Sequence, residues 1–118
     1  MIAVLMGGYS AEREISLLSG KAVYDALCNN KLDCFAFDLT QDNINELWSK
    51  EFDQAFIVLH GRGGEDGFIQ SELKKNNIAY TGSDAKASNL CMDKAATKVL
   101  WSHYNLPLSA SVVATKGE

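Results

Sequence analysis

The sequence predicts a three-layer α/β fold in which a mostly parallel sheet carries helices on both of its faces. Short apolar runs of strand length alternate along the 118 residues with longer segments whose apolar residues recur at helical spacing. Two of these runs, residues 2–6 and 55–59, lead directly into glycine-containing loops. Continuous apolar runs are typical of strands buried on both faces, and parallel neighbours require right-handed crossovers.

The first half of the chain predicts three strands and two helical segments. Residues 2–6 suit a buried strand, and apolar side chains at helical spacing from residue 12 to residue 28 predict a helix after it. Residues 34–39 predict the second strand, residues 43–48 one or two short helical turns, and residues 55–59 the third strand.

The second half continues the alternation of helix and strand. Residues 68–76 predict a helix that ends near two asparagines, residues 78–80 a short fourth strand, and residues 85–90 a further helical segment. Asp93 is placed to cap a last helix. The stripe of that helix is formed by Ala96, Val99, Leu100 and His103.

The length predicts one domain followed by the start of a linker. A chain of 118 residues is long enough to bury a core without disulfide or metal staples. We expect the domain to cover residues 1–108, with Pro107 ending the last helix, and the start of a linker to cover residues 109–118. Within that linker, residues 111–114 are expected to be extended.

The composition argues against several classes of protein. The net charge of −4 gives no electrostatic footprint for nucleic acid. No apolar run approaches the roughly 18 residues that span a bilayer, and no signal segment opens the chain, so we expect a cytoplasmic protein without membrane contact. Cys28, Cys34 and Cys91 include no Cys-x-x-Cys pair, and their odd number fits reduced thiols better than a disulfide framework or a zinc site.

The first loop, residues 7–14, offers a carboxylate near the start of a helix. Its glycines match neither of the motifs for dinucleotides and phosphates, Gly-x-Gly-x-x-Gly and Gly-x-x-x-x-Gly-Lys-Ser/Thr. Glu12 is positioned to receive a cation such as a substrate ammonium; alternatively, it only complements the helix dipole, which is worth about 0.3–1 kcal/mol. We expect Arg13 and Glu14 to be surface charges.

The second loop, residues 60–67, combines a histidine, four glycines and charges of both signs. The glycines either let a ligand approach the backbone closely or supply positive φ for an elaborate turn. His60 can donate to a carboxylate or exchange a proton near neutral pH; alternatively, it is satisfied by a neighbour such as Glu65. Because ligands of open α/β sheets bind beyond the carboxyl ends of the strands, we expect both loops to line one site.

Lys94 begins the last predicted helix, directly after Asp93. A positive charge there opposes the helix macrodipole unless an anion lies close, which hints at an anionic ligand. Alternatively, Lys94 is an exposed lysine that Asp93 balances. The sequence shows no group of residues identifiable as a metal site.

Four motifs together resemble the N-terminal, pre-ATP-grasp domain of bacterial D-alanine:D-alanine ligases. They are residues 7–16, 59–67, 80–83 and 92–94, and their order and spacing agree along essentially all 118 residues. The second motif is specific to this family within the wider ATP-grasp ligases. The resemblance implies a Rossmann-like α/β domain on the substrate side of such an enzyme.

The resemblance implies roles for four residues. Glu12 would be catalytic and would hold the ammonium of the first D-alanine, and His60 would lie against the carboxylate region of the substrate. Lys94 would reach the phosphates of ATP. Glu65 would not contact the ligand itself, and its carboxylate would support the side chain of His60 or Lys94.

The resemblance also implies a ligase of peptidoglycan precursor synthesis that depends on ATP and on magnesium or manganese. Its central and C-terminal domains, which clamp ATP and supply the metal ligands, would be the partners of this domain, together with D-alanine and ATP. We expect the 118 residues alone to be inactive and to expose apolar groups toward those domains. Two other functions stay open: a ligase that joins D-alanine to D-lactate or another acceptor, and a non-catalytic α/β binding module. A homodimer is also possible.

Overall fold

Four parallel strands form one sheet in the order β2-β1-β3-β4 in the computed structural model, which describes residues 1–116. The strands are β1 (Ile2–Gly7), β2 (Cys34–Leu39), β3 (Gln54–Ile57) and β4 (Ala79–Tyr80). Every pairing is parallel, with β1 lying between β2 and β3. The predicted parallel sheet is confirmed.

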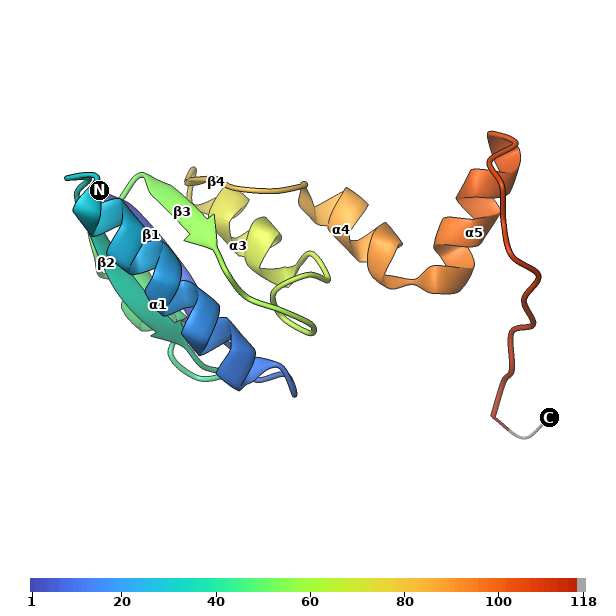
Figure 1. Ribbon diagram of the computed structural model, residues 1–118, viewed down its shortest axis with the longest axis horizontal. Coiled ribbons are helices and arrows are strands. Elements are labelled where there is room, and N and C mark those ends of the chain that lie inside the picture. Colours follow the sequence, from blue (N-terminus) through green and yellow to red (C-terminus); the bar gives the residue numbers. More distant parts are fainter. Residues whose placement is uncertain (117–118) are drawn as a thin grey trace.

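Five helices connect and follow these strands within the described part of the chain. They are α1 (Arg13–Asn29), α2 (Ile44–Trp48), α3 (Phe68–Lys75), α4 (Ala85–Met92) and α5 (Lys94–His103). Helix α1 covers one face of the sheet, while α2 and α3 pack on the other (Figure 1). The predicted three-layer arrangement with helices on both faces is therefore confirmed.

Alternation along β1 divides the core between the two faces. Val4 and Met6 face α1 in one buried cluster. Ala3 and Leu5 lie in the other cluster, which includes Leu47 of α2 and residues of α3. Both faces of β1 are therefore buried, as the continuous apolar run predicts. Full burial of one such aliphatic side chain stabilises the fold by about 1.5–3 kcal/mol.

Most element boundaries differ from the predicted ones by one or two residues, and the third strand and residues 111–114 differ most clearly. The third strand ends at Ile57, yet Val58 still donates its backbone N–H to the Leu5 carbonyl at 2.9 Å and stays buried. Residues 58–59 therefore prolong the buried part of the strand while the chain turns into the second loop. Residues 111–114 have no regular structure and are exposed, and the last two residues of the predicted linker, 117–118, lie outside the described residues.

Helix α5 begins where the sequence predicts, because the carboxylate of Asp93 accepts a hydrogen bond from the Ala96 backbone N–H at 3.0 Å. Its stripe is not buried, since Val99 is 60% exposed and Leu100 38% exposed. Helix α5 lies beside α4 and away from the sheet (Figure 1). No helix within residues 1–116 is long and apolar enough to cross a membrane.

Candidate functional site

A buried serine ties the ends of β1 and β3 together beneath the first loop. The backbone N–H of Gly7 donates to Ser16 Oγ at 2.9 Å, and Ser16 Oγ donates in turn to the Val58 carbonyl. Ser16 lies in the first turns of α1 and is fully buried. Because both loops leave from these strand ends, this bridge sets their starting positions. Sequence reasoning gave Ser16 no role, since its partners lie on other elements.

Arg13 is a half-exposed charge at the surface, as the sequence predicts, and it is engaged in an ion pair. Its guanidinium makes two hydrogen bonds to the Asp38 carboxylate, both at 2.7 Å, and a third to the Gly8 carbonyl at 3.1 Å. Pairing with the Asp38 carboxylate raises the pKa of Arg13. The bidentate contact joins the start of α1 to the end of β2 and holds the first loop from the side. Glu14, the other expected surface charge, is exposed.

The second loop is folded by its own acidic side chains. Glu65 Oε2 accepts the backbone N–H of Gly61 at 3.0 Å, and Asp66 accepts the N–H groups of Gly63 and Phe68, both at 3.1 Å. These bonds satisfy backbone donors that a glycine-rich loop would otherwise leave open. The acidic side chains of this loop therefore stabilise its backbone conformation.

The two loops touch each other directly. Ser10 Oγ donates to the His60 carbonyl at 2.8 Å and accepts the backbone N–H of Glu12 at 3.1 Å. Gly61 has a φ of +66°, and a Cβ atom there would lie only 3.0 Å from Glu12 Oε2. The glycine is therefore required both by its backbone conformation and by the close approach of the Glu12 carboxylate. The structure brings Glu12 and the backbone of His60 to the same edge of the sheet.

The carboxylate of Glu12 is not used to cap its helix. Glu12 occupies the N-cap position of α1, where no hydrogen bond from its side chain to the helix backbone is formed. If Glu12 has only a structural role, that role is therefore limited to the attraction between its charge and the helix dipole. The carboxylate faces the second loop, with its oxygen beside Gly61.

His60 lies beside Glu65 at the limit of hydrogen bonding. Its Nδ1 atom is 3.5 Å from Glu65 Oε1, and the two side chains are 32% and 48% exposed. An N···O distance of this length makes a weak hydrogen bond. Glu65 therefore stands next to His60, while its other oxygen holds the loop backbone at Gly61.

A cavity of about 570 Å³ opens between the second loop, the end of the sheet and α4. His60 and Glu65 line it from the loop, Gln70 from α3, and Thr81 and Ser83 from the segment after β4. The side chain of Gln70 is nearly buried and donates its Nε2–H to the Gly64 carbonyl at 2.9 Å, whereas its Oε1 atom has no partner within residues 1–116. Gln70 thereby fixes the backbone of the second loop at Gly64 from α3.

Lys94 is separated from the two loops. It is the first residue of α5 and lines a different cavity of about 300 Å³ between α4 and α5, together with Cys91 and Trp101. The neighbouring Asp93 carboxylate is engaged as the helix cap. The structure does not bring Lys94 next to Glu12 or His60, and its predicted contact with phosphates stays a prediction.

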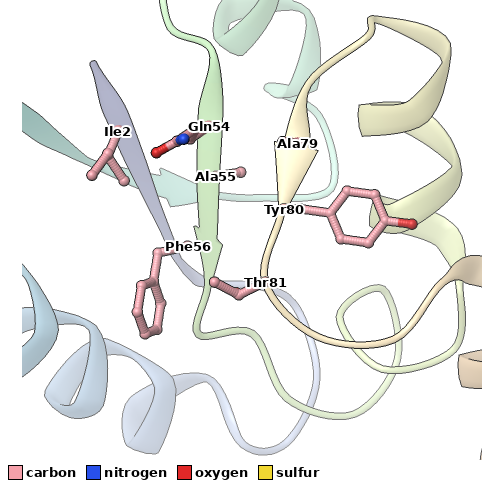
Figure 2. A pocket seen from close by; sticks show the side chains of 7 residues that line it. All are labelled: Ile2, Gln54, Ala55, Phe56, Ala79, Tyr80 and Thr81. Atoms are coloured by element: carbon pink, nitrogen blue, oxygen red, sulfur yellow. The ribbon is translucent and has the colours of Figure 1, made fainter.

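A further cavity of about 280 Å³ lies at the β3–β4 side of the sheet (Figure 2). Ile2 and Phe56 point to one side of the sheet, and the ring of Tyr80 points to the other (Figure 2). Thr81 Oγ1 accepts the backbone N–H of Ile57 at 3.0 Å. The lining carries no charged side chain, so this cavity offers no chemistry comparable with that of the loop site.

Metal-ligating side chains are not gathered at any of these cavities. Within residues 1–116, no group of three or more His, Cys, Asp and Glu side chains is arranged to hold a metal ion. The loop site consists instead of two carboxylates, one imidazole and a glycine-rich backbone. Such a set can bind an ammonium through Glu12 and a carboxylate through His60.

The sequence of this chain is similar to those of known proteins. The family described as D-ala D-ala ligase N-terminus matches residues 1–48. The D-alanine–D-alanine ligase of Ruthia magnifica is 61% identical over 115 residues, and that of Vesicomyosocius okutanii is 58% identical over 114 residues. The alignments cover 98% and 97% of this chain but 39% of each relative, so the chain spans about two fifths of their length.

The fold of this chain is also similar to those of solved ligase structures. The D-alanine–D-alanine ligase of Bacillus anthracis complexed with ATP has a TM-score of 0.86 and 32% identity, covering 99% of this chain and 40% of that one. The enzyme from Aeromonas hydrophila has a TM-score of 0.86 and 25% identity, covering 99% and 51%. VanG D-Ala:D-Ser ligase of Enterococcus faecalis has a TM-score of 0.74 and 29% identity, covering 88% and 41%. In sequence and in fold, this chain matches the N-terminal region of D-alanine–D-alanine ligases.

Proposed function

We propose that this chain is the substrate-side part of an ATP-dependent D-alanine–D-alanine ligase. The single observation that carries the proposal is the contact between the two loops, which brings Glu12 and His60 to one edge of the sheet. The relatives that share 58% and 61% of its residues are named D-alanine–D-alanine ligases. In such a ligase, ATP phosphorylates the carboxylate of a first D-alanine, and the amine of a second attacks the activated carboxyl.

Glu12 holds the ammonium of the first D-alanine in this proposal. Its carboxylate is free of the helix backbone and borders the glycine loop at Gly61. A charge-assisted hydrogen bond between the two is worth about 1.5–3 kcal/mol. His60 binds the carboxylate region of the same substrate, and the Glu65 carboxylate lies beside its ring at 3.5 Å.

ATP and magnesium belong to the longer ligase in this proposal. One similar structure is that of a ligase complexed with ATP, and Lys94 is the residue of this chain that would contact the phosphates. No group of three or more potential metal ligands is gathered among residues 1–116. In this proposal the metal ligands are supplied by the central and C-terminal domains, with residues 109–118 as the start of the linker toward them. A cytoplasmic location follows as part of the same proposal.

A ligase with another acceptor is the second candidate. The similarity to VanG D-Ala:D-Ser ligase, with a TM-score of 0.74, favours keeping it, because the fold does not distinguish the acceptor. The first D-alanine is common to both candidates. Identifying the products made by the full-length protein from mixtures of D-alanine, D-serine and D-lactate separates them.

The test replaces Glu12 in the full-length protein. Glu12→Gln keeps the size of the side chain and removes its charge, so we expect the KM for the first D-alanine to rise about ten- to hundredfold while the KM for ATP is unchanged. Glu14→Gln is the matched control, because Glu14 is an exposed acid two residues further on. An unchanged KM for the first D-alanine would exclude the role given to Glu12, and absence of any D-alanine-dependent ADP release by the wild-type protein would exclude the ligase.

A further inference from the structure

Two cysteines lie in contact at the end of α1 that is opposite the loop site. Cys28 Sγ and Cys34 Sγ are 3.5 Å apart, and both residues are free cysteines. Helix α1 has 17 residues, so this pair lies about 25 Å along the helix from the Glu12 end. The odd number of cysteines in the sequence gave no sign of this pairing. Neither residue takes part in the proposed substrate site.

The backbone fixes the contact from both sides. The turn after α1 is closed by the Lys31 N–H to the Cys28 carbonyl at 2.9 Å and by the Leu32 N–H to the Leu27 carbonyl at 3.1 Å. Lys31 adopts a φ of +58°, which reverses the chain direction in a left-handed conformation. The Ile2 N–H donates to the Asp33 carbonyl at 2.9 Å, so the next residue, Cys34, is held against β1 at the start of β2.

The two thiols are accessible to different extents. Cys28 is exposed and Cys34 is half-buried. Burial and hydrogen bonding to Cys28 raise the pKa of Cys34, which favours its thiol form. An exposed thiol can therefore meet a dissolved oxidant, while its neighbour is held within reach as a resolving thiol.

We propose that Cys28 and Cys34 form a peroxide-sensitive dithiol that closes to an intramolecular disulfide. In the first step, the Cys28 sulfur attacks the O–O bond of hydrogen peroxide, giving a sulfenic acid and releasing one water molecule. In the second step, the Cys34 sulfur attacks the sulfenic sulfur, an S–S bond forms, and the hydroxyl leaves with the Cys34 proton as a second water molecule. Peroxide is thereby reduced and two thiols are oxidised. The sulfurs need to approach by about 1.5 Å, which rotation of the side chains can supply.

The third cysteine provides an internal control. Cys91 is exposed and lies on α4, in contact with neither member of the pair within the described residues. If accessibility alone determined oxidation, Cys91 would be oxidised in the same way as Cys28. If the contact between the two sulfurs determines it, only Cys28 and Cys34 form a disulfide.

The experiment treats the purified protein with a small excess of hydrogen peroxide, then counts free thiols and maps peptides by mass spectrometry without reduction. We expect the wild-type protein and Cys91→Ser each to lose two thiols, to give a linked peptide containing positions 28 and 34, and to regain both thiols with dithiothreitol. Cys28→Ser and Cys34→Ser should give no intramolecular crosslink. Circular dichroism before treatment ensures that each variant is folded.

The contrary outcomes are equally specific. Wild-type protein that keeps both thiols at peroxide doses that oxidise Cys91 would overturn the proposal. So would a crosslink between Cys91 and either other cysteine in place of the 28–34 bridge, or oxidation of Cys28 to a sulfinic acid without any linked peptide. None of these readouts depends on ligase activity.

Discussion

Removing the hydroxyl of Ser16 tests how the two loops are held. In Ser16→Ala, the buried Gly7 N–H and the Val58 carbonyl both lose their partner on α1. The side chain is 0% exposed, so water does not replace it without disturbing the core. Each buried polar group left without a partner costs about 1–3 kcal/mol. We therefore expect the free energy of unfolding to fall by about 2–4 kcal/mol.

Ser19→Ala is the matched control for this change. Ser19 lies on the same helix one turn later and is only half-buried, and it forms no such bridge between strands within the described residues. Both substitutions raise helix propensity by a similar amount, so the difference between the two variants isolates the bridge. Urea unfolding followed by circular dichroism measures both free energies. If the two variants agree within about 0.5 kcal/mol, the bridge does not stabilise the strand ends and the reasoning fails.

Three further substitutions address the loops and the last helix. Gly61→Ala places a side chain at a φ of +66° and against Glu12, so we expect about 1–3 kcal/mol of destabilisation in the same unfolding assay; an unchanged midpoint would contradict the close loop contact. Asp38→Asn weakens the half-exposed pair with Arg13, so the loss of stability should be small and should shrink at high salt. A large loss that does not depend on salt would contradict this expectation. Lys94→Ala in the full-length protein should raise the KM for ATP about ten- to hundredfold without changing that for D-alanine, and the reverse pattern would remove Lys94 from the nucleotide site.

Local pattern was sufficient for most of the fold. Strand β2 has the predicted bounds, residues 34–39, because apolar residues and flanking turn residues mark both of its ends. Helix α1 was equally visible from its periodicity. The stripe of α5 shows the limit of this reasoning: spacing predicts the helix, but what covers its apolar side depends on neighbours that the spacing does not describe.

The site could be predicted only in part. Glu12 and His60 each follow a strand, and in a parallel sheet the ends of neighbouring strands meet at one edge, so their proximity could be expected from strand order. The Arg13–Asp38 pair joins positions 25 residues apart, and the Ser16–Val58 bond joins positions 42 apart. No short segment contains both partners of such a pair. The position of Lys94 depends on how α4 and α5 leave the sheet, which no local pattern specifies.

The strand order also explains how ligand preference can change while the fold is kept. From β1 the chain passes to α1 on one face, and from β3 it passes to α3 on the opposite face. The two loops therefore follow adjacent strands and lead to helices on opposite faces, which is the arrangement of a topological switch point in an open α/β sheet. Tyr9, Glu12 and Arg62 are exposed and belong to neither buried cluster, so these loop positions can change without altering the core. A D-alanine–D-alanine ligase and a D-Ala:D-Ser ligase both have folds similar to that of this chain, and exposed loop positions are where their ligand preference can differ without a change in the core.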